Sequence, residues 1–249
     1  MTKEAVALLE FLDNHEIDIF DKQLVVGNNF SEGALRTLIK TNYFRMIENG
    51  KYVRHNFSDE YVIGSFLAKD GGVAYWTAMN FHGLTEQIPN LVYVQTSHAK
   101  ENKTIFGVRY KFIKVKPGKL LGFQTIGYGN HQFHISDIEK TIVDCFDLPA
   151  YGGGYAEIIK AFSRADLRPQ KMVKYCKAIN NIAVVKRLAF LSELLMKPDM
   201  DYFLNYAQSV NNEKYNLFES DGETNGKTNG RWNLIMNMDN DEILEIANS

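Results

Sequence analysis

Apolar residues recur through the first part of the chain at spacings that predict three helices and a β-hairpin. Residues 3–14 place them at the i, i+3, i+4 and i+7 positions of a helix with one buried face. Asp21–Val26 predicts a short second helix, and a third begins after Ser31, a favourable N-cap. Tyr43–Arg54 has the pattern of a hairpin, with Asn49-Gly50 supplying the positive φ angles of a tight two-residue turn. This order of elements is typical of a winged helix-turn-helix.

A second pattern, from Gly72 to Pro89, organises the remainder of the chain. Tyr75, Trp76, Met79 and Phe81 fall on about two helical turns and leave almost no polar face. A helix at the periphery of a protein keeps one solvated stripe. We therefore expect other elements to cover this helix, which would act as the hub of the core.

The segments beyond this hub predict a sheet followed by helices. Short runs rich in branched and aromatic residues occur at residues 91–96, 104–108, 110–115, 120–126 and 131–135. The connections between these runs are too short for crossover helices, so we expect an antiparallel sheet. Helical spacing dominates from Ser136 to Tyr206, and residues 214–237 predict another hairpin before an acidic terminal helix.

These patterns predict an α+β fold with two domains. Residues 1–57 would form a winged helix-turn-helix domain, and residues 58–249 a larger α+β domain with an antiparallel sheet and a helical C-terminal half. Hydrophobic residues make up 45% of the 249 residues, which is enough for a substantial core. Neither a secretion signal nor an apolar run of about 18 residues occurs, so we expect a cytoplasmic protein without a membrane partner.

The formal net charge of −2 conceals an uneven distribution of charge. Eight bases and two acids lie between Glu157 and Arg187, whereas three bases and ten acids follow Lys197. Either the acidic tail folds back over the basic region, or the basic face is free to meet a phosphate backbone. In the second case, the basic surface would comprise Lys160, Arg164, Lys171, Lys174 and Lys177.

The N-terminal pattern predicts a way of binding double-stranded DNA. In a winged helix-turn-helix the third helix enters the major groove, and the hairpin lies along a phosphate backbone. The DNA-binding residues predicted in this way are Ser31, Glu32, Arg36, Thr37, Lys40, Lys51 and Arg54. Residues 1–57 contain seven bases and eight acids, so the domain as a whole is not basic. A role in protein contacts or oligomerisation is therefore the alternative.

Two separated stretches resemble the AbiEi family of bacterial antitoxins. They are Tyr75–Pro89 (YWTAMNFHGLTEQIP), followed by Val92-Tyr93-Val94, and Ser136–Cys145 (SDIEKTIVDC) with its glycine-rich exit. The resemblance covers roughly residues 1–200 and agrees in order and spacing. It implies an antitoxin that represses its own promoter at inverted repeats through the winged helix. It also implies a larger domain that counteracts a nucleotidyltransferase-like toxin without forming a stable complex with it.

No sequence pattern of an enzyme stands out. A nucleotidyltransferase needs a Gly-Ser pair with an Asp-x-Asp pair close behind it, and none follows Gly64-Ser65. The triplet Gly152–Gly154 lacks the Gly-Lys-Ser/Thr ending of a phosphate-binding loop. We therefore expect a protein that is not an enzyme and holds no cofactor. A hydrolase that reverses the toxin's modification is the alternative, because a site assembled from distant residues leaves no motif.

Cysteine and histidine residues predict no metal centre. Cys145 and Cys176 lie within amphipathic patterns without a partner at metal-ligand spacing, so we expect both in the core. His131 and His134 are an odd number of positions apart on a predicted strand. Their side chains would point to opposite faces of that strand, which argues against a shared metal.

Overall fold

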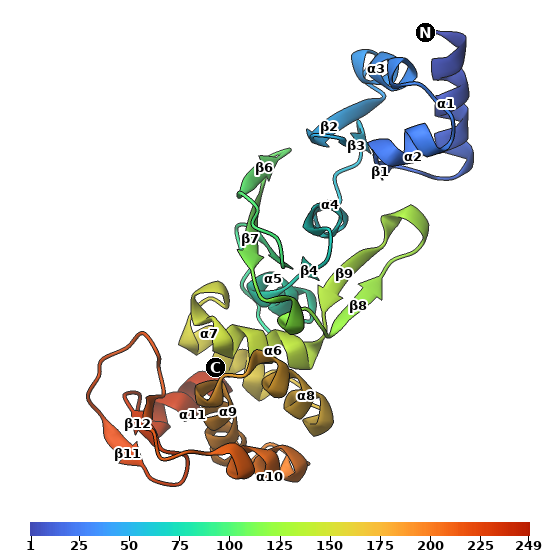
Figure 1. Cartoon of the computed structure of the whole chain (residues 1–249). Helices are drawn as coiled ribbons and strands as arrows, with labels where there is room; N and C mark the ends of the chain where they lie inside the picture. The colour runs from blue at the N-terminus through green and yellow to red at the C-terminus, as the bar shows by residue number, and fades with distance from the viewer.

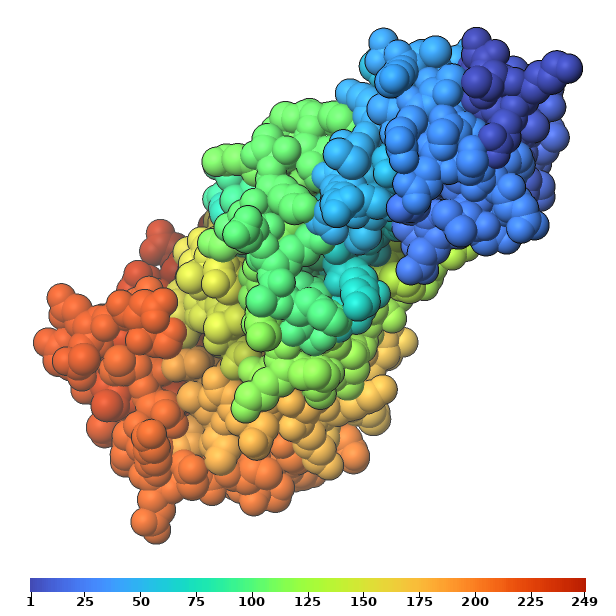
Figure 2. Space-filling model, turned by 45° about the horizontal axis from the view of Figure 1, so that its top comes forward, coloured from blue at the N-terminus to red at the C-terminus, as the bar shows by residue number.

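The sequence folds into eleven α-helices and three β-sheets in a computed structural model that describes residues 1–249, and the fold is α+β as predicted. The molecule is elongated. Residues 1–57 form one end, a central sheet follows them, and the helical C-terminal half forms the other end (Figure 1). Figure 2 shows the same order from another direction. No helix combines the length and the apolar composition that crossing a bilayer requires.

The N-terminal module, residues 1–57, packs three helices against a three-stranded sheet. Its elements are α1 (Lys3–Asn14), β1 (Ile19–Asp21), α2 (Lys22–Gly27), α3 (Glu32–Lys40), β2 (Phe44–Glu48) and β3 (Lys51–Arg54). The strand order is β1-β3-β2, and both pairings are antiparallel. Leu8 and Leu12 of α1 meet Leu35 and Leu38 of α3 in a separate hydrophobic cluster. The three helices and the hairpin follow in the predicted order, and β1, which pairs with β3, is a strand that the sequence did not predict.

The hairpin turn between β2 and β3 differs in detail from the prediction. Gly50 has a φ of 76°, whereas Asn49 does not have a positive φ. The pairing register shifts between Met46 and Glu48, as at a β-bulge. The bulge in β2 contributes to the reversal of the chain direction. Only Gly50 therefore adopts the left-handed conformation at the turn.

The central part of the chain forms a six-stranded mixed sheet. Its elements are α4 (Glu60–Ala68), β4 (Gly72–Val73), α5 (Tyr75–Phe81), β5 (Val92–Thr96), β6 (Lys103–Ile105), β7 (Val108–Lys114), β8 (Phe123–Ile126) and β9 (Phe133–Ser136). The strand order is β6-β7-β5-β4-β9-β8. The prediction of an antiparallel sheet is wrong, because β5 pairs in parallel with β7, and β4 with β9. The short strand β6 reverses the chain between β5 and β7, so this parallel pair forms without a crossover helix.

Helix α5 is the predicted hub, and other elements cover most of it. Tyr75 and Met79 are buried, and α5 packs against α6 (Ile138–Asp147) and β5. Cys145 of α6 is buried too, with its sulfur 3.4 Å from the sulfur of Met79. Phe81 remains 36% exposed, so the cover is incomplete at the last turn.

The C-terminal half consists of helices and a small sheet. After α6 come α7 (Tyr155–Arg164), α8 (Pro169–Ile179), α9 (Ile182–Leu194), α10 (Asp201–Val210), β10 (Asn216–Leu217), β11 (Lys227–Asn229), β12 (Leu234–Met236) and α11 (Asn240–Asn248). The prediction of a hairpin at residues 214–237 is wrong, because β10 and β12 pair in parallel. Strand β11, which lies in the predicted loop, pairs antiparallel with β12. The predicted terminal helix is present as α11 and packs against α7.

The acidic C-terminal region folds back over the basic segment. Lys186 is buried and donates hydrogen bonds to the carbonyl oxygens of Asn212 (3.0 Å) and Lys214 (2.5 Å). Arg187 is buried beside it and donates to the carbonyl oxygen of Leu217 through two nitrogens, at 3.1 and 2.9 Å. These two bases bind backbone carbonyl groups of the tail, so they contribute nothing to a surface for phosphate.

The N-terminal module is docked against the body of the protein. Ile19, Ile47 and Val53 join the same hydrophobic cluster as α4 and the central sheet. Asn130, in the turn between β8 and β9, accepts hydrogen bonds from the backbone N–H groups of Asp18 (2.7 Å) and Ile19 (2.8 Å). A shared apolar cluster and hydrogen bonds of this kind hold the orientation of the module relative to the body.

Candidate nucleic-acid interface

Helix α3 lies beside α1 at the free end of the N-terminal module (Figure 1). Ser31 caps the helix, since its hydroxyl oxygen accepts a hydrogen bond from the backbone N–H of Ala34 (3.2 Å). The same hydroxyl donates to the carboxylate of Glu4 at 2.7 Å. Ser31 therefore serves to begin the helix and to join it to α1. The remainder of the molecule lies beyond the module's sheet, so one side of α3 faces solvent (Figure 1).

Two bases flank one acid on this solvent-facing side. Glu32 forms ion pairs with Lys22 of α2 (2.6 Å) and with Arg36 (3.5 Å). Hydrogen bonding to Lys22, followed by its charge, lowers the pKa of Glu32. The side chain of Arg36 is still 72% exposed, and Lys40 is exposed and forms no ion pair. Thr37 is half-buried and donates to a backbone carbonyl one turn earlier, at 2.9 Å.

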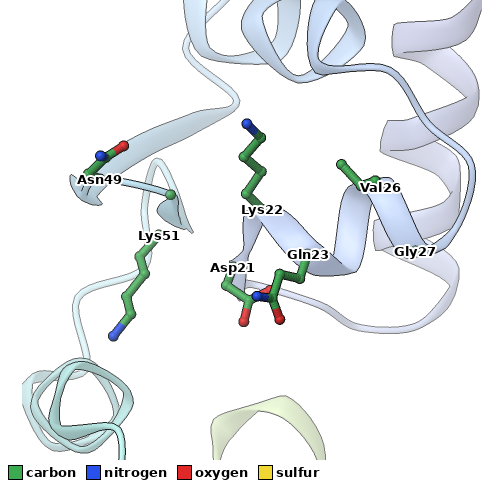
Figure 3. Close-up of a pocket in the computed structure, with 8 residues that line it drawn as sticks. Asp21, Lys22, Gln23, Val26, Gly27, Asn49 and Lys51 are labelled. Carbon is green, nitrogen blue, oxygen red and sulfur yellow. The ribbon is translucent and has the colours of Figure 1, made fainter.

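An open depression of about 640 Å³ lies beside α3, between α2 and the β2–β3 turn (Figure 3). Its lining residues are Asp21, Lys22, Gln23, Val26, Gly27, Asn49, Gly50 and Lys51. The depression forms because Asp21 pairs with Lys51 in the β1–β3 ladder, which places the start of α2 next to the turn. Lys22 points toward α3, and Lys51 points away, toward α4 (Figure 3). The start of α2, the turn and α3 thus share one polar surface.

Lys51 and Arg54, the two residues predicted to contact DNA from the hairpin, have partners inside the protein. Lys51 donates to a backbone carbonyl of α4 at 3.0 Å, and burial lowers its pKa. Arg54 pairs with Asp13 at 2.6 Å and with Asp18. These contacts tie the hairpin to α4 and to the end of α1. The exposed polar side chain at the turn itself is Asn49.

The second predicted basic surface does not form one continuous face. Lys171 pairs with two buried carboxylates, at 2.6 and 3.5 Å, and Arg164 with a carboxylate of the loop after α5, at 3.4 Å. Lys174 and Lys177 are exposed on α8 without ion pairs, and Lys160 is half-buried on α7. The structure therefore leaves two exposed lysines without ion pairs where the sequence predicts a patch of five bases.

The body of the protein contains a polar cluster that lies in the core. Lys140 is fully buried and pairs with Asp144. The Gln95 amide donates to the hydroxyl oxygen of Tyr75 at 2.9 Å and to Asp144 at 3.2 Å. Burial raises the pKa of Asp144, and the ammonium group of Lys140 opposes that rise. All four groups have partners within the cluster, which joins α5, β5 and α6.

Two features of the N-terminal surface were not predicted from the sequence. The first is the depression beside α2, and the second is the bridge from Lys22 to Glu32. Both depend on β1, a strand of three residues that is too short for its periodicity to be recognised. The available signal is Asp21, which caps α2 directly after the apolar pair Ile19-Phe20.

The two histidines of the segment 131–135 lie in different environments. His131 precedes β9 and its Nε2 atom lies 2.7 Å from the carboxylate of Asp18. His134 lies on β9, and its Nδ1 atom is 3.3 Å from the hydroxyl of Thr125 on the neighbouring strand. His131 thus belongs to the contact between the module and the body.

Comparison with known proteins gives a relative by fold. No protein-family model matches the chain, and no curated protein matches it. Among solved structures, the chain is similar to the RV2827C protein from Mycobacterium tuberculosis, with a TM-score of 0.63 and 14% sequence identity. The alignment covers 100% of this chain and 96% of that chain. At this level of identity the similarity shows a common fold that extends over both the N-terminal module and the body.

Proposed function

We propose that this protein binds double-stranded DNA through α3, represses its own promoter and acts as the antitoxin to a nucleotidyltransferase-type toxin. The observation that carries the DNA-binding part is the outward face of α3. Arg36 and Lys40 are exposed there, next to Lys22, and Glu32 is the acid among them. A helix that lies at the end of the molecule with cations on its solvent-facing side fits the major groove.

Each residue of this face has a role that its chemistry allows. Arg36 is long enough to read the two acceptors of a guanine edge, and Thr37 contacts a base or a phosphate. Lys40 and Lys22 bind phosphates as point charges. Lys22 and Arg36 would exchange the Glu32 carboxylate for phosphate oxygens on binding. Asn49 faces the same surface from the hairpin turn and supplies a neutral contact.

The antitoxin part of the proposal is supported by the resemblance to the AbiEi family. Tyr75–Pro89 and Ser136–Cys145 carry that resemblance. Their helices, α5 and α6, pack against each other in the main core of the body. Segments that form a core specify a fold, so the residues that counteract a toxin would lie on the surface of the body.

The test of DNA binding is fluorescence anisotropy with a labelled duplex from upstream of the protein's own gene. We expect tighter binding to this duplex than to a scrambled one. The double variant Arg36→Ala, Lys40→Ala should weaken binding by about tenfold or more, since each good base or phosphate contact contributes about 1–3 kcal/mol. Lys3→Ala with Lys227→Ala is the matched control, because both lysines are exposed and form no ion pair. Unchanged affinity in the α3 variant would refute this interface.

Co-expression with the neighbouring gene tests the antitoxin part separately. If that gene encodes a nucleotidyltransferase-like toxin, the α3 double variant should still rescue growth while it no longer represses the promoter. Point variants are preferable to deleting residues 1–57, because Ile19, Ile47 and Val53 cover apolar surface of the body. Loss of repression and rescue together, in a folded α3 variant, would contradict two separable roles. A neighbour without Gly-Ser and Asp-x-Asp motifs would favour a binding module outside a toxin pair.

A further inference from the structure

A second depression, in the body of the protein, combines an apolar floor with a rim of lysines. It has a volume of about 730 Å³ and lies between the segment after β7 and the ends of α6 and α8. This volume falls within the range of roughly 300–1,000 Å³ that is typical of small-molecule sites. The lining residues are Lys114, Val115, Lys116, Gly118, Lys119, Asp147, Leu148, Ala178, Ile179, Asn180 and Asn181.

The charges of this rim do not cancel. Asp147 is the acid in the lining, and it is already bound by Lys119 at 2.7 Å and by the side-chain amide of Asn181 at 2.9 Å. Lys114 and Lys116 are exposed, form no ion pair and stand on the same segment, two positions apart. Two ammonium groups are thus left without an anion at one edge of the depression. The carbonyl end of α8 also meets the depression and offsets part of this charge.

The floor of the depression is apolar. Val115, Leu148 and Ala178 are half-buried, and Ile179 is buried. These side chains come from three separate segments of the chain and meet at the depression. The flat apolar part of a ligand can therefore cover them while its charged part remains at the rim. The exposed Asn180 next to them forms no side-chain hydrogen bond within the protein, so its amide is available to a polar edge.

We propose that this depression binds a phosphate-bearing ligand of mononucleotide size. The base would lie against Val115, Leu148 and Ala178, and the phosphates would meet Lys114 and Lys116. Lysines bind phosphate groups as compact point charges. This site is separate from the α3 face, which lies at the other end of the molecule (Figure 1).

Isothermal titration calorimetry of the full-length protein with ATP tests the site, with inorganic pyrophosphate and a 20-nucleotide single-stranded RNA as further probes. We expect saturable binding of ATP that is weakened about tenfold or more in Lys114→Ala, Lys116→Ala, since two phosphate contacts are lost. Ala178→Phe, which fills the depression and leaves its charge unchanged, should weaken ATP more than pyrophosphate. Lys3→Ala with Lys227→Ala should leave ATP binding unchanged.

Three outcomes would overturn the proposal. One is the absence of ATP binding at millimolar concentration in the folded natural protein. Another is binding of the RNA alone, which would assign the lysines to a nucleic-acid backbone. The third is an equal loss of ATP binding in the α3 variant Arg36→Ala, Lys40→Ala, since that would indicate non-specific attraction to anions. The absence of ATP binding would not bear on the proposed DNA-binding face, because binding of the promoter duplex tests that face separately.

Discussion

The outer face of α3 and the segment from Glu157 to Arg187 both contain clustered bases, but the folded protein uses them differently. On α3, Arg36 and Lys40 remain in solvent. In the second segment, Lys186 and Arg187 are buried against backbone carbonyl groups of the C-terminal region. The comparison teaches that the density of bases in a sequence does not locate a nucleic-acid surface. What matters is whether the fold leaves a base in solvent, as at Arg36 and Lys40, or buries it, as at Lys186 and Arg187.

The largest expected difference between these regions is in stability. Arg187→Ala should lower the free energy of unfolding by about 2–4 kcal/mol, because two charge-assisted hydrogen bonds to Leu217 and the packing of a buried side chain are lost. Arg36→Ala should change it by no more than about 0.5 kcal/mol, as at most exposed positions. Urea denaturation of both variants measures this contrast. Equal changes in the free energy of unfolding would mean that the hydrogen bonds of Arg187 do not stabilise the fold.

The next effect concerns the dependence of stability on pH. Burial alone would raise the pKa of Glu48, but hydrogen bonds from Lys100 and Lys103 outweigh it and lower the pKa from 4.5 to about 2. The lowered pKa stabilises the folded state above pH 4.5, and this contribution is lost as the pH falls toward 2. After allowance for screening by solvent, we expect about 1–2 kcal/mol.

Glu48→Gln should therefore flatten the pH dependence of unfolding between about pH 2 and 5 and leave a less stable protein at neutral pH. Thermal melts of both proteins across this range provide the measurement. Glu101→Gln is the matched control, because Glu101 follows Lys100 in the sequence, is exposed and forms no ion pair. A variant that kept the full acid dependence of the natural protein would show that Glu48 does not bind the two lysines in solution.

A smaller, local effect is expected where the module meets the body. Asn130→Ala removes hydrogen bonds to the backbone N–H groups of Asp18 and Ile19, so these amides should exchange with solvent faster. The expected cost is about 1–2 kcal/mol, confined mainly to β1. Hydrogen exchange of the β1 peptide reports it, and the peptide of α9 serves as the internal reference. Unchanged protection of β1 would show that this turn does not hold the module.

The helices of the N-terminal module were predictable because their signals are local. Ser31 caps α3 as expected, and the buried stripe of Leu35 and Leu38 follows from helical spacing. The hub helix was predictable for the same reason, since Tyr75 and Met79 leave no polar face to solvent. In each case the deciding interactions lie within about four residues of one another.

The mixed sheet and the exposed surface were not predictable in the same way. The parallel pairing of β5 with β7 depends on how β6 reverses the chain, which no residue spacing encodes. The loss of Lys51 and Arg54 from the DNA-facing surface depends on α4 and on the end of α1, which are distant in sequence. A lysine next to a turn has the same sequence signal whether it faces DNA or a backbone carbonyl.

The most direct test is the salt dependence of DNA affinity for two double variants, Arg36→Ala, Lys40→Ala and Lys174→Ala, Lys177→Ala. Each phosphate contact contributes a slope of about −0.9 to the plot of log affinity against log salt concentration. The first variant should bind the promoter duplex more weakly and with a slope shallower by about one to two. The second should match the natural protein in both affinity and slope. If the α8 variant lost affinity while the α3 variant kept it, DNA would bind to the body, and the central claim would be wrong.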